Sequence, residues 1–159
     1  MPLAPIIGVN TLLMSASATP VPDIVALALT PTNNGIVNIP GETSTGAFVV
    51  ASVNLGLGAP ITVSTDTGGT TLPITIALCQ TNPVTGVCLS DPTSTVPVQI
   101  NTNDTPTFAI FVTGTASALF APANNAFVPF DPAHNRVFVR FKDNAGITRG
   151  ATSVAVRTQ

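Results

Sequence analysis

Charged side chains are scarce in this sequence, which has five Lys or Arg and seven Asp or Glu among its 159 residues. No Lys or Arg occurs before Arg136, and the mean hydropathy is nonetheless positive, at +0.49. In ordinary soluble domains about a quarter of the residues are charged. Much of the surface is therefore predicted to lie against other surfaces, and this scarcity of charge is the main functional indication in the chain.

Trp and Tyr are also absent, so the eight Phe are the only residues of the Phe, Trp and Tyr group. Phosphate binding needs clustered Lys or Arg together with stacking aromatics, and a net charge of −2 with five cations does not supply them. No apolar run approaches the length of about 20 residues that spans a bilayer. The sequence therefore predicts no nucleic-acid partner and no membrane-spanning helix.

Residues that could carry catalysis are few. His134 is the single histidine, and no Gly-x-Ser-x-Gly stretch or other nucleophile signature accompanies it or the nearby Asp131. One His and two Cys cannot complete a tetrahedral zinc site, and of the seven carboxylates no two are adjacent and most fall in predicted turns. We expect His134 to be a turn residue, and we expect no catalytic residue, no metal and no cofactor: the protein is predicted not to be an enzyme.

The two cysteines, Cys79 and Cys88, flank a short segment that contains Asn82-Pro83 and Thr85-Gly86. These dipeptides predict a loop between two extended segments, which would bring the cysteines face to face. A disulfide here would stabilise the fold by roughly 3 kcal/mol and would imply an oxidising compartment. The alternative is a pair of buried, reduced thiols. We favour the disulfide and, with it, an extracellular or cell-surface location.

Residues 1–22 differ from the rest of the chain because they carry no charge. Four prolines in this segment exclude a regular helix, and apolar residues of one parity are typical of an extended strand: Leu3, Ile7, Val9 and Leu13. Ala16-Ser17-Ala18 is similar to a signal-peptide cleavage site, but a basic n-region is missing. We interpret residues 1–22 as an extended apolar arm that packs on another surface, and residues 23–159 as the folded domain.

From Asp23 onward the sequence predicts short strands separated by turn residues. They are Ile24–Thr30, Ile36–Ile39, Ala47–Leu55, Ile61–Thr65, Leu72–Cys79, Val96–Ile100 and Thr107–Thr113. No helical period occurs between them. The stretch 116–132 is the longest irregular one and contains Phe120, Phe127 and Phe130, either as a loop pinned to the core by aromatic side chains or as an apolar interface patch.

The last predicted element is a hairpin, in which Arg136–Lys142 and Gly150–Arg157 flank a turn at 143–146. Pairing Lys142 with Arg149 would place Val154 and Val156 on the same face as Val137 and Val139. It would place every cation of the chain on the opposite face: Arg136, Arg140, Lys142, Arg149 and Arg157. Such a face prevents edge-to-edge pairing of strands, and it is also suited to meet acidic turns of a neighbouring copy.

About eight strands at this spacing predict an all-β, two-sheet antiparallel sandwich with an extended N-terminal arm. In GAFVVASVNLGLG, TVPVQINTNDTPTFAIFV and NRVFVRFKDNAGITRGATSVAVRT the chain resembles the immunoglobulin-like and fibronectin-type-III-like sandwich modules of bacterial surface proteins. The resemblance covers about residues 23–159 and is one of pattern. It implies a surface module with an immunoglobulin-like fold.

Two functional hypotheses follow. The first is a non-enzymatic subunit of an extracellular bacterial filament or pilus-like homopolymer, in which the arm adds head-to-tail as a strand to a neighbouring copy. The second is a surface adhesin or a carbohydrate-binding immunoglobulin-like module, with the arm packed within its own domain and a glycan or cell-surface ligand as partner. The first is favoured, because sugar platforms usually rely on Trp or Tyr.

Overall fold

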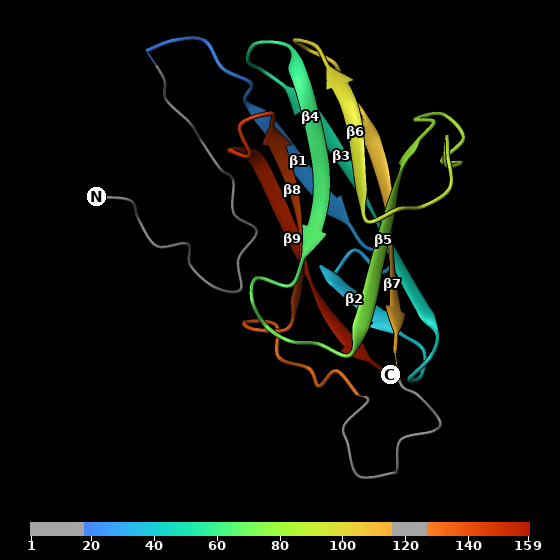
Figure 1. Ribbon diagram of the computed structural model, residues 1–159. Coiled ribbons are helices and arrows are strands. Elements are labelled where there is room, and N and C mark those ends of the chain that lie inside the picture. Colours follow the sequence, from blue (N-terminus) through green and yellow to red (C-terminus); the bar gives the residue numbers. More distant parts are fainter. Residues whose placement is uncertain (1–17, 116–126) are drawn as a thin grey trace.

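The computed structural model describes residues 18–115 and 127–159 and is all-β in this part of the chain. Two sheets stack face to face, as in a sandwich (Figure 1). The strands are β1 (Ile24–Leu29), β2 (Ile36–Ile39), β3 (Thr45–Asn54), β4 (Ala59–Asp66), β5 (Ile74–Thr81), β6 (Thr95–Ile100), β7 (Thr107–Gly114), β8 (Arg136–Asp143) and β9 (Thr148–Thr158). Each predicted strand is present, with both ends within two residues of the prediction, so the two-sheet sandwich is confirmed.

The first sheet has four strands in the order β1-β3-β7-β5, and the second has five in the order β2-β9-β8-β4-β6. All neighbours are antiparallel except β2 and β9, which run parallel. The parallel pair differs from the prediction of a wholly antiparallel sandwich. It arises because the chain crosses from one sheet to the other between β1 and β2, so that β2 joins the second sheet beside the last strand.

The core lies between the sheets and follows from strict alternation along the strands. In β3 the burial pattern alternates at almost every residue, with Phe48 and Val50 inside. Phe108 of β7 meets Phe141 of β8 edge to face across the core, with ring centroids 5.7 Å apart. Branched side chains that fit a pleated surface therefore fill the space between the layers, as the sequence pattern indicates.

Asn54, at the end of β3, is fully buried and uses its whole side chain to join three parts of the fold. Its Oδ1 accepts hydrogen bonds from the backbone N–H groups of Asp23 (3.1 Å) and Gly56 (3.0 Å). Its Nδ2 donates to the carbonyl oxygens of Leu57 (2.9 Å) and Ile100 (3.2 Å). A buried amide stabilises a fold only when its polar atoms are satisfied, and here all of them are.

The closing hairpin has the predicted register from Arg136 to Phe141, and then departs from it. Phe141 pairs with Gly150, but a bulge follows, so Lys142 pairs with Thr148 and the predicted Lys142–Arg149 pair is wrong. The turn causes the shift, because the Asp143 carboxylate accepts hydrogen bonds from the N–H groups of Ala145 and Ile147. The turn between the two strands is therefore one residue shorter than predicted, and β9 begins at Thr148.

Gly150 of β9 lies against the backbone of Ile24 in β1. A Cβ atom at this position would overlap the carbonyl oxygen of Ile24, which is backbone and cannot rotate away. We therefore predict that Gly150→Ala lowers the free energy of unfolding by about 1–3 kcal/mol, the usual cost of overfilling a packed site. Chemical denaturation measures this change. Ala151→Ser, one residue further on, is the control, and equal stability of the two variants would contradict the assignment.

Candidate interaction surfaces

The four-stranded sheet contains no charged side chain. Its strands, all within the described residues, read IVALAL, TGAFVVASVN, TFAIFVTG and ITIALCQT. Inward-facing residues of these strands form the core, so every second residue points away from the other sheet. Val25, Val53 and Ala109 share the outward side of β1, β3 and β7 with six further apolar residues, which we call the outer apolar face: Leu27, Leu29, Ala47, Val49, Ala51 and Phe111.

Strand register arranges these residues in rows. Leu27 lies beside Ala51, Leu29 beside Val49, and Ala47 beside Phe111. Three of these residues are well exposed: Leu27 at 64%, Leu29 at 51% and Val49 at 46%. A contiguous group of exposed aliphatic side chains differs from the scattered ones that any soluble protein shows, and it marks a surface suited to association.

Threonine hydroxyls at the margins of this sheet bond to one another across the strands. The Oγ1 atoms of Thr45 and Thr113 lie 2.8 Å apart, and the Oγ1 atoms of Thr81 and Thr107 lie 2.7 Å apart. Each pair uses part of its hydrogen-bonding capacity within the sheet. These hydroxyl groups at the margins of the outer apolar face therefore need fewer hydrogen bonds from water than unpaired hydroxyls would.

The edges of the two sheets are unequally open to a further strand. In the described part of the chain β1 is an edge strand of six residues without proline. The edge of β5 is covered, because Leu78 and Thr93 exchange backbone hydrogen bonds of 2.7 and 2.9 Å. Edge strand β6 contains Pro97, which has no N–H to donate, and β2 has only four residues. The β1 edge is therefore the best suited to accept a strand.

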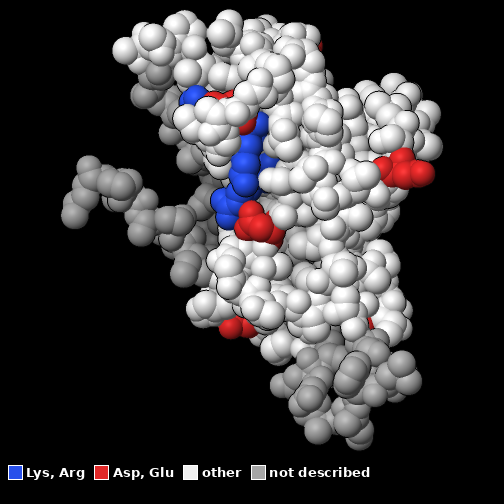
Figure 2. Space-filling model, in the orientation of Figure 1, with Lys and Arg blue, Asp and Glu red and all other residues white. Residues whose placement is uncertain are grey.

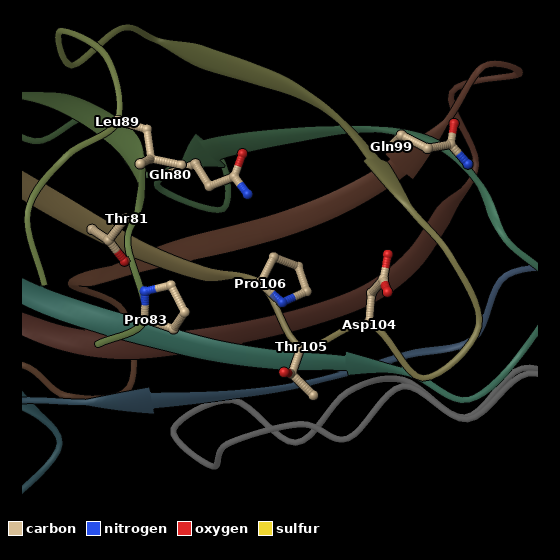
Figure 3. Close-up of a pocket in the computed structure, with 8 residues that line it drawn as sticks. All are labelled: Gln80, Thr81, Pro83, Leu89, Gln99, Asp104, Thr105 and Pro106. Atoms are coloured by element: carbon tan, nitrogen blue, oxygen red, sulfur yellow. The ribbon is translucent and has the colours of Figure 1, made fainter. Parts of the chain in front are cut away.

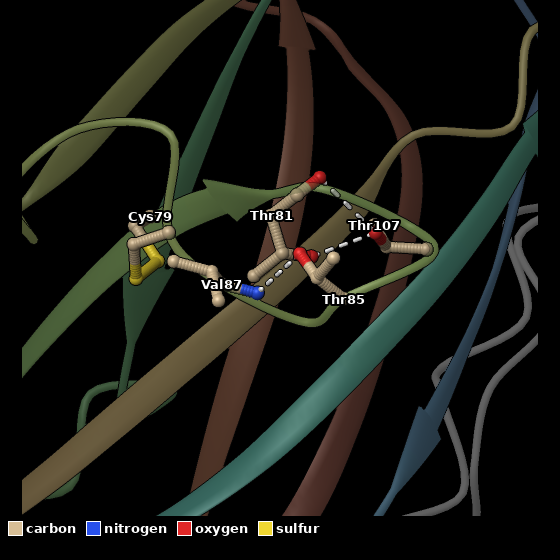
Figure 4. Close-up of a disulfide and its surroundings, with 6 residues drawn as sticks. Cys79, Thr81, Thr85, Val87 and Thr107 are labelled. Carbon is tan, nitrogen blue, oxygen red and sulfur yellow. Dashed lines mark hydrogen bonds between the residues drawn. A yellow bond between two sulfur atoms is a disulfide. The ribbon is translucent and has the colours of Figure 1, made fainter.

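Cys79 and Cys88 form the predicted disulfide, with Cα atoms 5.6 Å apart (Figure 4). Cys79 is buried on β5, and the segment after Cys88 runs back along that strand, where the Leu89 N–H donates to the Gln80 carbonyl at 2.8 Å. The disulfide thus holds a loop against the β5 edge of the uncharged sheet. Exposed aliphatic side chains continue onto that loop: Val84, Val87 and Leu89.

The cations of the closing hairpin form a band on the face shown in Figure 2, with acidic groups adjoining it. Arg136 is buried, and it donates to Ser153 Oγ from Nη2 (2.9 Å) and to the Pro132 carbonyl from Nη1 (2.8 Å). Arg140 donates to both carboxylate oxygens of Asp66, one of them at 3.1 Å, and its guanidinium lies over Phe138. These two arginines are therefore occupied within the domain.

The other three cations, Arg149, Arg157 and Lys142, differ in their partners. Arg149 contacts the Asp143 carboxylate at 2.7 Å. Arg157 donates to Asn38 Oδ1 at 2.7 Å and stacks on Phe130, with the guanidinium carbon 5.3 Å from the ring centre. Lys142 pairs with Thr62 on the neighbouring strand and is partly exposed. Whether any of these groups meets a neighbouring copy stays a prediction.

Electrostatic effects follow from these pairs. Partial burial raises the pKa of Asp66, but hydrogen bonds from Arg140 and Gly68 outweigh it, so the pKa lies below the ordinary 3.8. Asp143 behaves alike: the backbone N–H of Ile147 and the Arg149 side chain lower its pKa despite the opposing effect of desolvation. Burial lowers the pKa of Arg136. Both carboxylates are therefore ionised at neutral pH and serve structural pairs.

His134 lies in a turn with its Nδ1 atom 2.8 Å from Asp131 Oδ2. The hydrogen bond with His134 lowers the pKa of Asp131, and both groups lie at the surface. This places His134 in the predicted turn. Among residues 18–115 and 127–159, no three His, Cys, Asp or Glu side chains gather closely enough to hold a metal ion.

The predicted aromatic residues divide between two parts of the chain. Phe127 and Phe130 are 54% and 55% exposed, and Phe120 lies outside the described residues. The predicted arm residues also lie outside the described residues: Leu3, Ile7, Val9 and Leu13. No helix in the part of the chain that the structure describes is long and apolar enough to cross a membrane.

A pocket of about 240 Å³ lies where the disulfide loop and β5 approach the end of β6 (Figure 3). Amide, hydroxyl and carboxylate groups line it together with apolar rings: Gln80, Thr81, Pro83, Leu89, Gln99, Asp104, Thr105 and Pro106. One oxygen of Asp104, Oδ2, accepts hydrogen bonds from the backbone and the side chain of Asn101, at 2.8 and 3.0 Å. The pocket offers hydrogen-bonding groups but no cation.

Comparison with known proteins adds little to this description. No protein-family model and no curated protein matches the sequence. The chain is similar in structure to the CARDB domain of the PF1109 protein from Pyrococcus furiosus, solved in complex with di-metal ions (TM-score 0.39, 10% identity, 89% of this chain and 97% of that chain). It is also similar to the N-terminal domain of PorA (0.46, 12%, 84% and 97%).

A third similar structure is the alkylpurine DNA glycosylase AlkC of Pseudomonas fluorescens bound to DNA containing an abasic site analog. The TM-score is 0.33 and the identity 11%, over 89% of this chain and 31% of that chain. Nothing about function follows from likenesses at this level.

Sequence reasoning missed the outer apolar face, although the signal was present. The alternation in IVALAL places Leu27 and Leu29 on the side opposite Ile24, and the four strands lack charge. What the sequence did not reveal is which strands are neighbours. The order β1-β3-β7-β5 gathers the uncharged strands into one sheet.

We predict that the double variant Cys79→Ala/Cys88→Ala lowers the free energy of unfolding by about 3 kcal/mol, because the unfolded chain gains the freedom that the loop denies it. Denaturant titration measures the loss. The wild-type protein under reducing conditions is the control and should lose a similar amount, while the variant should not respond to reductant. A wild-type transition that is unchanged by reduction would contradict this role.

Proposed function

We propose that this β-sandwich module is a non-enzymatic structural subunit of an extracellular bacterial filament or pilus-like homopolymer. In this proposal the N-terminal arm of one copy adds as a strand to a neighbouring copy. The observation that carries it is an uncharged four-stranded sheet that ends in an open edge strand, β1. The disulfide between Cys79 and Cys88 supports an oxidising, extracellular compartment.

The β1 edge supports strand addition because no strand within residues 18–115 and 127–159 pairs with its outer side. Asp23 accepts a hydrogen bond from Leu55 at 2.8 Å, so in the antiparallel ladder the odd-numbered residues of β1 bond to β3. The N–H and C=O groups of Ala26 and Ala28 then point to the outer edge. An added strand would satisfy these groups and extend the sheet, which is the principle of β-strand addition.

The composition of the arm matches this acceptor. Residues 1–22 carry no charge, and Leu3, Ile7, Val9 and Leu13 share one parity. A strand of this kind would place its apolar side chains beside Leu27 and Leu29, where a charged strand would lose hydration without gaining a partner. Head-to-tail addition, repeated without closure, produces a fibre.

A second candidate is a surface adhesin or carbohydrate-binding module with the arm packed intramolecularly. It draws on the pocket beside the disulfide loop, whose amides and carboxylate are groups that hydrogen-bond sugar hydroxyls. The exposed rings of Phe127 and Phe130 would add apolar contact area. We place it second because the uncharged sheet has no role in it.

We predict that the full chain forms fibres visible by negative-stain electron microscopy, and that deletion of residues 2–14 abolishes them. The truncated chain loses the donor strand but keeps every described strand, so it should remain folded, which circular dichroism checks. Replacing the arm residues Leu3, Ile7, Val9 and Leu13 by Asp in the full-length chain is the matched control for length, and it should abolish fibres equally.

Two outcomes would overturn this proposal. One is unchanged assembly after deletion of residues 2–14. The other is a wild-type chain that stays dispersed and is retarded by glycans in affinity electrophoresis, in which case the second candidate takes its place.

A further inference from the structure

The outer apolar face presents a problem that strand addition at the β1 edge does not solve. A new strand covers the edge of the sheet, whereas Leu27, Leu29 and Val49 project from its face. Three strands about 4.8 Å apart and three rows about 7 Å apart give this face roughly 300 Å² per copy. Leaving that area in water is unfavourable by the usual relation between apolar area and free energy.

The absence of charge restricts what covers this face. A charged surface placed on it would lose its hydration and find no opposite charge in return. The outer side of this chain's own second sheet is therefore unsuitable, because it carries Arg140 and Lys142 beside exposed Thr62. The uncharged sheet of a second copy meets the requirement.

At the row of Leu27 and Ala51 the relief of the face is also self-complementary. Its β1 column has two leucines, and its β3 column has the small Ala51 and Ala47 on either side of Val49. A twofold axis parallel to the strands and midway between β1 and β3 places each column over the other column of the second copy. Leu27 of one copy then lies over Ala51 of the other, twice, as an isologous contact requires.

We propose that the outer apolar faces of two copies pack on each other, with β1 of each copy over β3 of the other. The contact rests on the outer apolar face alone and does not depend on the arm. Because about 600 Å² of the two faces is buried, the contact is of the weak class, and it becomes strong only when repeated along an assembly.

Cysteine crosslinking tests this geometry, since the described residues contain no free cysteine. A mixture of Leu27→Cys and Ala51→Cys copies of the full chain should give crosslinked dimers with a short bismaleimide. Each variant alone should also give dimers, because two copies of one position lie only one strand spacing, about 4.8 Å, further apart sideways across the axis. Gln99→Cys, exposed on β6 of the other sheet, is the control for random collision.

Charge substitution supplies a second measurement. The variant Leu27→Lys/Val49→Lys should raise the dissociation constant of the dimer by about 100-fold or more in sedimentation equilibrium, because like charges would face each other in an apolar contact. Gln99→Lys should leave it unchanged. A mixture that crosslinks no better than the Gln99 control, or a doubly substituted chain that associates like the wild type, would overturn the proposal.

The chain without residues 2–14 separates this contact from the proposed filament. It should still crosslink through Leu27→Cys and Ala51→Cys, whether or not the arm is a donor strand. Loss of the crosslink with the arm would overturn the face-to-face contact. A truncated chain that still forms both fibres and the crosslink would overturn the strand addition instead.

Discussion

The distribution of charge between the two sheets is the constraint on which the rest of this structure depends. The five-stranded sheet carries the cations on its outer side, where Arg140 and Arg136 are bonded to groups of the same chain. The four-stranded sheet has no charge on either face. One layer of the sandwich is thus suited to water, and the other has an apolar surface on both its inner and its outer side. We propose that copies associate through the uncharged layer, which joins the proposed strand addition to the proposed face-to-face contact.

Two local features reduce the number of unpaired backbone and hydroxyl groups at the margins of the uncharged sheet. The disulfide loop covers the β5 edge, and the threonine pairs at the margins bind each other. On β1 and β3 themselves, the side chains of Leu27, Leu29 and Val49 stay exposed. Natural sheets commonly protect their edges with covering loops, so the open β1 edge in the described part of the chain is a meaningful exception. Asn54 holds that edge in place, because its buried amide ties the residue before β1 to the ends of β3 and β6.

The strands were predictable because their information is local. Alternation in AFVVASVNL marks β3, and turn residues mark the ends of most strands. The disulfide was predictable for the same reason, since Asn82-Pro83 and Thr85-Gly86 shape the loop between its cysteines. Long-range facts were not predictable: Arg140 bonds to Asp66, 74 residues away, and β2 runs parallel to β9. The register error at Lys142 had a local cause in the Asp143 turn, whose hydrogen bonds produce a bulge that simple pairing does not anticipate.

We propose above all that copies of this protein associate through the uncharged sheet. Hydrogen–deuterium exchange of the full chain, measured over a range of protein concentrations, tests it most directly. The edge amides of Ala26 and Ala28 should exchange more slowly as the concentration rises, while those of the opposite edge strand β6 should not change. Exchange in β1 that is the same at every concentration would contradict the claim.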